Sequence, residues 1–428
     1  MKKAARNILL YSLFINLIAC TSNGKKDTKM KEKNISDILG NPDYLAISYG
    51  GYRTDSRRVQ PAMEQLKEDM KILAAMGIKI IRTYNVHMPH AVNVIKAIDE
   101  LKKEDKNFEM YVMLGAWIDC KNAWTGFEPI HEEESERNAI EIEQAVQLAN
   151  EHPDIVKVIS VGNEAMVKWA TAYFVSPIVI LKWVNYLQDL KQENKLPKDT
   201  WITSSDNFAS WGGGEDSYKG EELTALMKSV DYISIHTYPM HDTHYNPIFW
   251  GVSTEEEHLS NKSKIDSSMQ RAAEYAQSQY YSVKDYMLSL GIDKPIHIGE
   301  TGWASYCNGM YGNEGSMACD EYKEGLFYKL LRAWTKKEGI ACFYFEAFDE
   351  VWKDSDNPNG SENHFGLITI DGKVKFALWD LVDQGAFDGL RRGVNPITKT
   401  FEGNQDSLLN QVKLPPLKEV LIPEYQTQ

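Results

Sequence analysis

Eight short apolar runs recur along the chain, separated by longer segments of mixed character. Runs of this length that are rich in valine and isoleucine are typical of strands buried on both faces, as in a parallel sheet. The pattern therefore predicts eight parallel strands. They span residues 45–49, 79–84, 110–114, 156–161, 201–205, 232–236, 295–299 and 340–345.

The segments between these runs carry apolar residues at the spacing of amphipathic helices. The expected helices cover residues 60–75, 91–103, 134–151, 178–191, 221–228, 269–290 and 321–337, with a short one at 376–381. Strands that alternate with helices in this way predict an α/β fold of the (β/α)8 TIM barrel type. No linker divides the series, so we expect a single domain over residues 41–385. The tail, residues 386–428, has scattered prolines, and we expect it to pack on the barrel or to trail from it.

The N-terminus has the three-part layout of an export signal. Lys2, Lys3 and Arg6 precede an apolar run over residues 8–18, which is too short to span a membrane comfortably. The run leads to Cys20 in a sequence similar to the bacterial lipoprotein box, whose cysteine becomes the lipid-modified first residue of the mature chain. An ordinary cleaved signal peptide with an incidental cysteine is the alternative.

These features predict a lipoprotein-type signal peptide over residues 1–20 and a polar tether over residues 21–40. The likeness to the lipoprotein box implies an exported protein that an acyl group on Cys20 holds on a lipid membrane. We expect it on the periplasmic or cell-surface face of a bacterial envelope.

The formal net charge of −14 argues against nucleic acid as a partner. A neutral polysaccharide is compatible with this charge, although net charge alone cannot identify a substrate. The chain has 11 tryptophans and 22 tyrosines, which suits stacking on sugars, although large cores also use aromatic residues. We expect no cofactor, and we expect a monomer.

Four cysteines follow Cys20, namely Cys120, Cys307, Cys319 and Cys342. No CxxC pair exists, so a thiolate metal site has no support in the sequence. Cys307 and Cys319 bracket a glycine-rich loop and could form a disulfide in an oxidising compartment. The spacing leaves both the thiol and the disulfide states open.

Polar and aromatic residues gather where the predicted strands end, and this is the end at which TIM barrels carry their active sites. Glu164 follows the fourth strand directly and Glu300 follows the seventh, and we expect these strands to face one another across the barrel. Hydrolysis of a glycosidic bond needs two carboxyl groups, one to protonate the leaving oxygen and one to attack the anomeric carbon or to activate water. A helix-terminal acid at Glu164 and a salt-bridged rim residue at Glu300 are the alternatives.

Four sequence motifs follow one another around these two glutamates. They are Val161-Gly162-Asn163-Glu164, Ile298-Gly299-Glu300-Thr301-Gly302-Trp303, Phe345-Glu346-Ala347-Phe348-Asp349-Glu350 with Trp352-Lys353, and Glu362-Asn363-His364-Phe365-Gly366-Leu367. Their sequence and order resemble glycoside hydrolase family 17, the 1,3-β-glucanases, over residues 44–380. The resemblance implies a retaining endo-1,3-β-glucanase that hydrolyses laminarin-type β-glucan by double displacement, through a covalent glycosyl-enzyme.

The same resemblance implies a role for individual residues. Glu164 matches the general acid/base of the family, and Glu300 matches its nucleophile. Asn163 matches the residue that hydrogen-bonds the 2-hydroxyl of the sugar being cleaved. Tyr238 is expected to lie beneath the nucleophile and to help hold it ionised.

Further residues are expected to surround the cleavage site. Tyr84 and Trp303 match positions that contact the substrate. Glu350 and Lys353 match a charged pair beside the site, and Glu362 matches a further acid in the same loop. Lys353 is expected to favour the carboxylate form of the nucleophile.

Other residues near the strand ends have weaker signals. His236 closes a strand, and we expect it to hydrogen-bond within the sugar site. A metal site formed with His241, Asp242 and His244 is the alternative. Ala304 stands where plant members of the family usually have proline. Five tryptophans lie in predicted loops, and we expect two or three of them to bind glucose units: Trp117, Trp124, Trp169, Trp211 and Trp250.

Two other functions stay open at this point. A 1,3-β-glucan transglycosylase would use the same two glutamates but pass the glycosyl group to a second sugar. A non-catalytic surface glycan-binding protein would use the barrel only as a scaffold, and the two intact glutamates argue against it.

Overall fold

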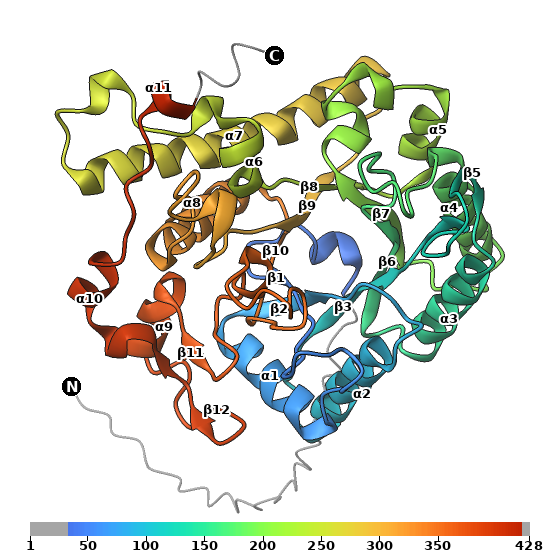
Figure 1. Ribbon diagram of the computed structural model, residues 1–428. Coiled ribbons are helices and arrows are strands. Elements are labelled where there is room, and N and C mark those ends of the chain that lie inside the picture. The colour runs from blue at the N-terminus through green and yellow to red at the C-terminus, as the bar shows by residue number, and fades with distance from the viewer. Residues whose placement is uncertain (1–32, 422–428) are drawn as a thin grey trace, which may run out of the picture. The chain divides into compact units, whose positions relative to one another are not determined.

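The fold was analysed in a computed structural model, which describes residues 33–421 (Figure 1). The predicted signal peptide, the lipidation site Cys20 and the tether up to residue 32 lie outside the described residues. Among residues 33–421, no helix is both long enough and apolar enough to cross a membrane.

Eight parallel strands close into a barrel, which confirms the predicted (β/α)8 fold. Going round the barrel, the order is β1, β10, β9, β8, β7, β6, β3 and β2. All eight predicted runs form barrel strands, and their ends move by only a few residues. The strands are β1 (Leu45–Ser48), β2 (Ile78–Arg82), β3 (Tyr111–Ala116), β6 (Val156–Asn163), β7 (Trp201–Asn207), β8 (Ile233–His236), β9 (Ile296–Thr301) and β10 (Cys342–Tyr344).

Helices surround the strands in Figure 1, as the alternating pattern predicts. The larger helices are α1 (Met63–Ala75), α2 (Pro89–Glu104), α3 (Arg137–Glu151), α4 (Pro177–Gln192), α5 (Glu221–Ser229), α7 (Asn261–Ser289) and α8 (Glu321–Glu338). The short helix predicted at 376–381 is a 3-10 turn (Phe376–Leu378) followed by α9 (Trp379–Asp383).

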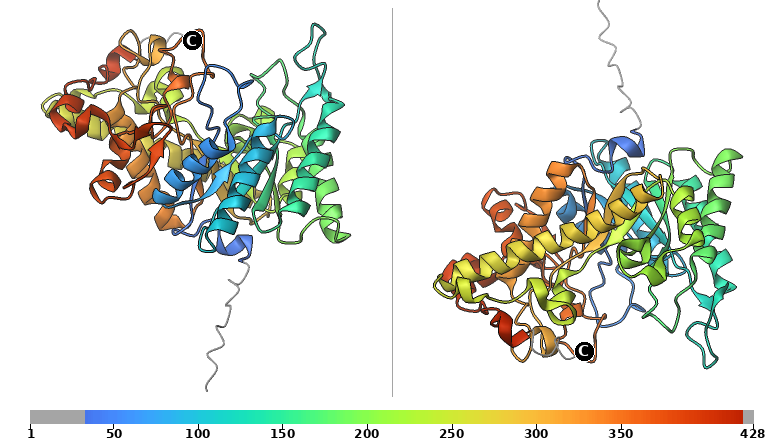
Figure 2. Two further views of the ribbon diagram at one scale, coloured as in Figure 1. Left: turned by 90° about the horizontal axis from the view of Figure 1, so that it is seen from below. Right: turned by 90° about the horizontal axis from the view of Figure 1, so that it is seen from above.

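Helix α7 begins eight residues before the predicted start at residue 269, and Figure 2 shows its length (yellow, right). The side chain of Ser260 accepts a hydrogen bond from Ser263 N and so caps the new first turn. A serine at this position satisfies one of the amide groups that a helix leaves unpaired at its N-terminus.

Side chains along the barrel strands alternate between two hydrophobic clusters. Ala46 on β1 and Ile80 on β2 belong to the cluster inside the barrel. Their neighbours Ile47 and Ile81 belong to the cluster between the strands and the helices. This period of two explains why the strands read as continuous apolar runs, since both faces are buried.

The predicted tether extends too far along the chain. A 3-10 turn (Ile35–Asp37) lies within it, and Ile35, Ile38 and Leu39 are buried against the cluster inside the barrel. Because these three apolar side chains belong to the interior cluster, this segment packs with the barrel and is not a tether.

The described part of the tail also packs on the barrel helices. Arg392 is buried and forms an ion pair with Asp69 of α1, with Nε and Oδ1 3.1 Å apart. Further along, Lys413 N donates to Asp320 Oδ2 at 3.1 Å, beside the start of α8. Residues 386–421 therefore pack on the barrel and do not trail from it.

Candidate active site

Glu300 lies near the C-terminal end of β9 and is 8% exposed. Its Oε2 accepts hydrogen bonds from Arg82 Nη1 at 3.0 Å and from Tyr84 Oη at 2.9 Å. Its Oε1 accepts from Tyr238 Oη at 2.7 Å, which is the contact that the family resemblance implied for Tyr238. Gly299 is needed beneath it, because a Cβ there would lie 2.2 Å from two serine hydroxyl oxygens.

The surroundings of Glu300 favour its charged form. Burial by itself raises the pKa of this carboxyl, but the electrostatic influence of His236 and Arg82 and the hydroxyl groups of Tyr238 and Tyr84 outweigh it. The pKa of Glu300 is therefore lowered from its ordinary value. A carboxyl that stays ionised can act as a nucleophile.

Glu164 has a different local setting at the end of β6. Its φ is +45°, in the left-handed region that side chains rarely adopt, and Gly162 before it has a φ of +84°. Its backbone N–H donates to Ser205 O of β7 at 3.0 Å. The Glu164 side chain is 27% exposed, and its Oε1 lies 3.0 Å from His236 Nδ1.

The sequence led us to expect the two glutamates on strands that face one another across the barrel, but their strands do not face one another directly. β7 and β8 lie between β6 and β9 in the barrel order, so the two carboxylates are three strands apart. This places His236 of β8 between them, and the register of β8 and β9 pairs His236 with Glu300.

Arg82 joins the elements of the site and is 1% exposed at the end of β2. Besides Glu300 it donates to Gly299 O at 2.6 Å, and its Nη2 donates to the side-chain oxygen of Asn163. Nη1 also lies 3.1 Å from His236 Nε2. Arg82 was not among the predicted site residues; an arginine that ends a barrel strand was the available signal, because a fully buried arginine is almost always paired.

His236 was expected to hydrogen-bond within the sugar site, and its hydrogen-bond partners are protein groups of the candidate site. The side chain is fully buried, and both ring nitrogens already have protein partners. Nε2 lies 3.1 Å from Arg82 Nη1 and 2.8 Å from Ser205 Oγ, and Nδ1 lies 3.0 Å from Glu164 Oε1. His236 thus connects Arg82 to Glu164.

Lys353 was expected to support the nucleophile, but it pairs with other carboxylates. Its Nζ lies 2.8 Å from Glu346 Oε2 and 3.8 Å from Glu350 Oε2. Glu350 is 1% exposed and accepts from Tyr52 N and Trp352 Nε1, both at 2.9 Å, so it is not placed to bind sugar either. Arg82 takes the part expected of Lys353, because β2 brings it within reach of β9.

Glu362 stays a prediction. Its side chain is 47% exposed, and its Oε1 lies 3.9 Å from His241 Nε2.

Within residues 33–421 no group of three or more histidine, cysteine, aspartate or glutamate side chains is arranged to hold a metal ion.

Trp303 is fully buried and does not contact a substrate cleft. Its Nε1 donates to Ala318 O at 2.9 Å, and its ring packs 5.6 Å from Trp250 and 5.2 Å from Phe327, measured between ring centroids. Trp211 and Trp250, considered as sugar platforms, are fully buried as well. All three indoles serve the core, since they lie beneath the strand-end loops and not on them.

An exposed aromatic surface lies instead beyond the end of β3. Trp124, 61% exposed, stacks on Tyr173 with 5.0 Å between ring centroids. The indole N–H groups of Trp117 and Trp124 both donate to Asp119 Oδ1, at 2.6 and 3.2 Å. Trp169 is also 61% exposed. For these side chains sugar stacking stays a prediction.

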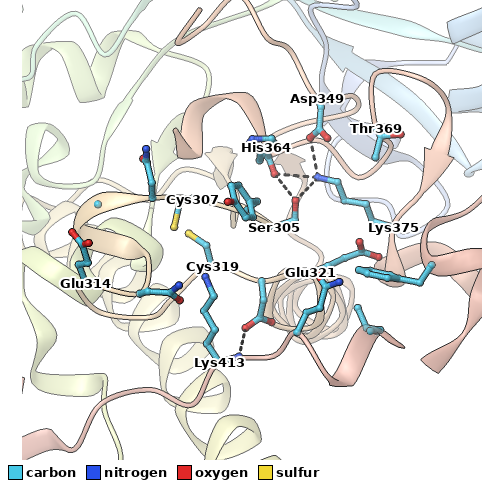
Figure 3. A pocket seen from close by; sticks show the side chains of 18 residues that line it. Ser305, Cys307, Glu314, Cys319, Glu321, Asp349, His364, Thr369, Lys375 and Lys413 are labelled. Carbon is cyan, nitrogen blue, oxygen red and sulfur yellow. Dashed lines mark hydrogen bonds and ion pairs between the residues drawn. The ribbon is translucent and has the colours of Figure 1, made fainter. Parts of the chain in front are cut away.

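Cys307 and Cys319 are free thiols, so the disulfide considered for them is not formed. Cys319 Sγ lies 3.9 Å from Met240 Sδ, which gives the thiol another partner. Figure 3 shows the two sulfur atoms facing one another at the edge of a cavity of about 750 Å³.

This cavity lies between the loop after β9, the segment after β10 and the tail. In Figure 3, Lys375 Nζ points toward Ser305, Asp349 and His364. It donates to Ser305 Oγ at 2.7 Å, to Asp349 Oδ1 at 2.8 Å and to the His364 carbonyl at 3.1 Å. These polar groups are hydrogen-bond partners of one another, and neither Glu164 nor Glu300 lines the cavity.

Two carboxylates at the C-terminal strand ends of a (β/α)8 barrel are the groups that hydrolysis of an O-glycosyl bond needs, at the place where such barrels carry their active sites. Residues 46–366 match the BtgE/BtgC glycoside hydrolase domain, and the chain belongs to this family.

Individual relatives agree with this family. The putative glucan endo-1,3-beta-glucosidase btgC of Aspergillus niger is 23% identical over 79% of this chain and 43% of its own length. The chain thus spans about half the length of the btgC relatives that it matches. The glucan 1,3-beta-glucosidase of Arthroderma benhamiae is 27% identical over 78% of this chain and 89% of its own.

Solved structures are similar as well. The crystal structure of an endo-laminarinase from Formosa Hel1_33_131 is 66% identical, with a TM-score of 0.90, over 90% of this chain and 98% of that chain. A β-1,3-glucanosyltransferase of Rhizomucor miehei, 19% identical with a TM-score of 0.52 over 78% and 96% of the two chains, shares the fold.

Proposed function

We propose that this glycoside hydrolase is a retaining endo-1,3-β-glucanase that acts on laminarin-type β-glucan. The observation that carries the proposal is the cage of donors from Arg82, Tyr84 and Tyr238, which holds Glu300 as an ionised carboxylate. The 66% identity to an endo-laminarinase supports the choice of substrate.

The chemistry follows from the two carboxylates. Glu300 attacks the anomeric carbon while Glu164 gives a proton to the leaving oxygen, and an ester between sugar and enzyme results. Glu164 then takes a proton from the water that hydrolyses this ester, so the configuration is retained. The side-chain oxygen of Asn163 is held by Arg82, which directs its amide N–H groups to a sugar hydroxyl.

Further groups extend the substrate site. Tyr84 borders Glu300 and is partly exposed, so it remains placed to contact the sugar at the cleavage point. The stacked pair of Trp124 and Tyr173 offers an aromatic face for a more distant glucose unit. A site that continues past the cleavage point on a barrel rim suits cleavage within a chain.

The Glu300→Gln variant tests the proposal. It removes the nucleophile while keeping the shape of the side chain, and we expect reducing-sugar release from laminarin to fall at least about a thousandfold. Glu314→Gln is the matched control, since Glu314 is an exposed acid in a loop after the same strand, and it should keep wild-type activity. A loss below about tenfold in Glu300→Gln would contradict the nucleophile assignment.

The products test the rest of the proposal. Retention predicts that NMR detects the β-anomer first when laminarin is cleaved. Sizing of the products separates hydrolysis from transglycosylation, because only transfer yields chains longer than the substrate. An α-anomer as the first product would rule out the double displacement.

We propose, too, that the protein is exported and lipid-anchored through Cys20, and that it is a monomer. The basic and apolar N-terminal segment supports this placement. Growth with a radioactive fatty acid should label the wild type and not the Cys20→Ser variant, and an unlabelled wild type would contradict anchoring.

A further inference from the structure

Asp206 is a buried carboxyl group that the catalytic steps above do not use. It lies at the C-terminal end of β7 and is fully buried. Its Oδ2 accepts from Met166 N at 2.7 Å, and its Oδ1 accepts from Asn207 N at 2.8 Å. One contact is therefore to its own strand, and the other is to the turn that carries Glu164.

That turn is tied to β7 at two points. Glu164 N donates to Ser205 O at 3.0 Å, and two residues later Met166 N donates to the Asp206 side chain. Between these ties the backbone adopts the left-handed conformation at Glu164. A non-glycine residue persists in that conformation only where its surroundings hold it there.

A second contact holds the far side of the same turn. Val175 N donates to Ala165 O at 2.7 Å, which fixes the turn to the following loop. This hydrogen bond does not connect the turn to β7. The Asp206 contact is thus the one that links the residue after the turn to the strand next to β6.

Ionisable groups from several elements face Asp206. Burial raises the pKa of Asp206 to about 7; the charge of Glu164 acts in the same direction, while the Met166 N–H and His236 oppose it. Burial raises the pKa of Tyr173 and Tyr218, and the charge of Asp206 acts in the same direction. Both oxygens of this buried carboxyl nevertheless accept backbone hydrogen bonds, which points to a requirement for its two acceptor atoms.

We propose that Asp206 is a positioning residue that orients Glu164 for proton transfer by tying Met166 N to β7. The inference rests on the proposed role of Glu164 as general acid/base. Asp206 does not touch the substrate and acts only through the turn.

Leaving groups separate this role from a general structural one. A glucose leaving group needs a proton from Glu164, whereas 2,4-dinitrophenolate leaves without one. A misaligned acid should therefore slow cleavage of laminari-oligosaccharides and spare formation of the glycosyl-enzyme from a 2,4-dinitrophenyl β-laminaribioside. Loss of fold or of the nucleophile would slow both.

The experiment compares Asp206→Ala with Asp231→Ala in the full barrel protein, because alanine removes the acceptor oxygens that an asparagine would partly keep. Asp231 is a matched control, because its Oδ2 accepts from Ile202 N at 2.6 Å at the other end of β7. For Asp206→Ala we expect kcat/KM on laminarihexaose to fall roughly 10- to 100-fold, while the burst of dinitrophenolate changes less than about threefold. Asp231→Ala should change the two rates equally or not at all.

Several outcomes would overturn the inference. Equal losses on both substrates in Asp206→Ala, or no loss on either, would remove the positioning role. If Asp206→Ala does not fold, Asp206→Ser, whose small side chain leaves room for water at Met166 N, is held to the same ratio. A wild type that cleaves neither substrate would instead overturn the proposed glucanase function, which is a distinguishable failure.

Discussion

Glu300 and Glu164 stand at the same end of the barrel, but their surroundings differ in almost every respect. Glu300 ends a regular strand and receives three hydrogen bonds from Arg82, Tyr84 and Tyr238. Glu164 sits on a left-handed turn, is more exposed, and has His236 as its side-chain partner. A nucleophile benefits from a fixed, ionised state, whereas an acid/base group must release and recover a proton and so needs contact with water.

The difference between the two glutamates depends most on Arg82, which donates directly to Glu300, the proposed nucleophile. In Arg82→Met the guanidinium no longer lowers the pKa of Glu300, so the carboxylate becomes protonated at a higher pH. The acid limb of kcat/KM should move to higher pH, and activity at its optimum should fall at least about a hundredfold. The pH profile on laminarin measures both effects, and an unmoved acid limb would contradict the role of Arg82.

Tyr238 and Tyr84 each supply one neutral hydrogen bond to Glu300, so their loss should matter less. Tyr238→Phe and Tyr84→Phe should each lower kcat roughly tenfold and move the acid limb upward by less than Arg82→Met does. Tyr84→Phe should also raise KM, because Tyr84 is placed to contact the sugar. Steady-state kinetics across pH gives the split, and a larger effect than that of Arg82→Met would reverse the ranking.

Lys353 provides the smallest expected effect on catalysis and a larger one on stability. Lys353→Met leaves Glu346 and Glu350 without their cation, so we expect a loss of about 3 kcal/mol in the free energy of unfolding. The acid limb of the pH profile should stay in place, since Lys353 pairs with these two acids and not with Glu300. Denaturant melts measure the loss of stability, and the same pH series measures the acid limb. An acid limb that moves in Lys353→Met would mean that Lys353 supports Glu300 after all.

The barrel and its two glutamates were accessible from the sequence. A local apolar run predicts each strand, and the Asn163-Glu164 and Glu300-Thr301-Gly302-Trp303 motifs lie where such runs end. The hydrogen-bond partners were not accessible in the same way. Arg82 meets Glu300 across 218 positions of sequence, and nothing local to either residue records that contact.

The errors have the same origin. Trp303 and Lys353 stand beside the catalytic motifs in the sequence, which suggested that they stand beside the nucleophile in space. Trp303 turns into the core beneath the loop, and Lys353 turns to Glu346. Side-chain direction at a strand end depends on how the following loop leaves the strand, and that is decided by packing with other segments.

By itself, then, the sequence determined the eight strands, their order along the chain and the two carboxylates at their ends, because hydrophobic periodicity and short motifs are local properties. The tertiary structure alone decided that β7 and β8 lie between the two glutamates, that His236 pairs in register with Glu300, and that Arg82 reaches both. Those features depend on the stagger of strands around a closed barrel, which brings together residues that no short stretch of the chain contains.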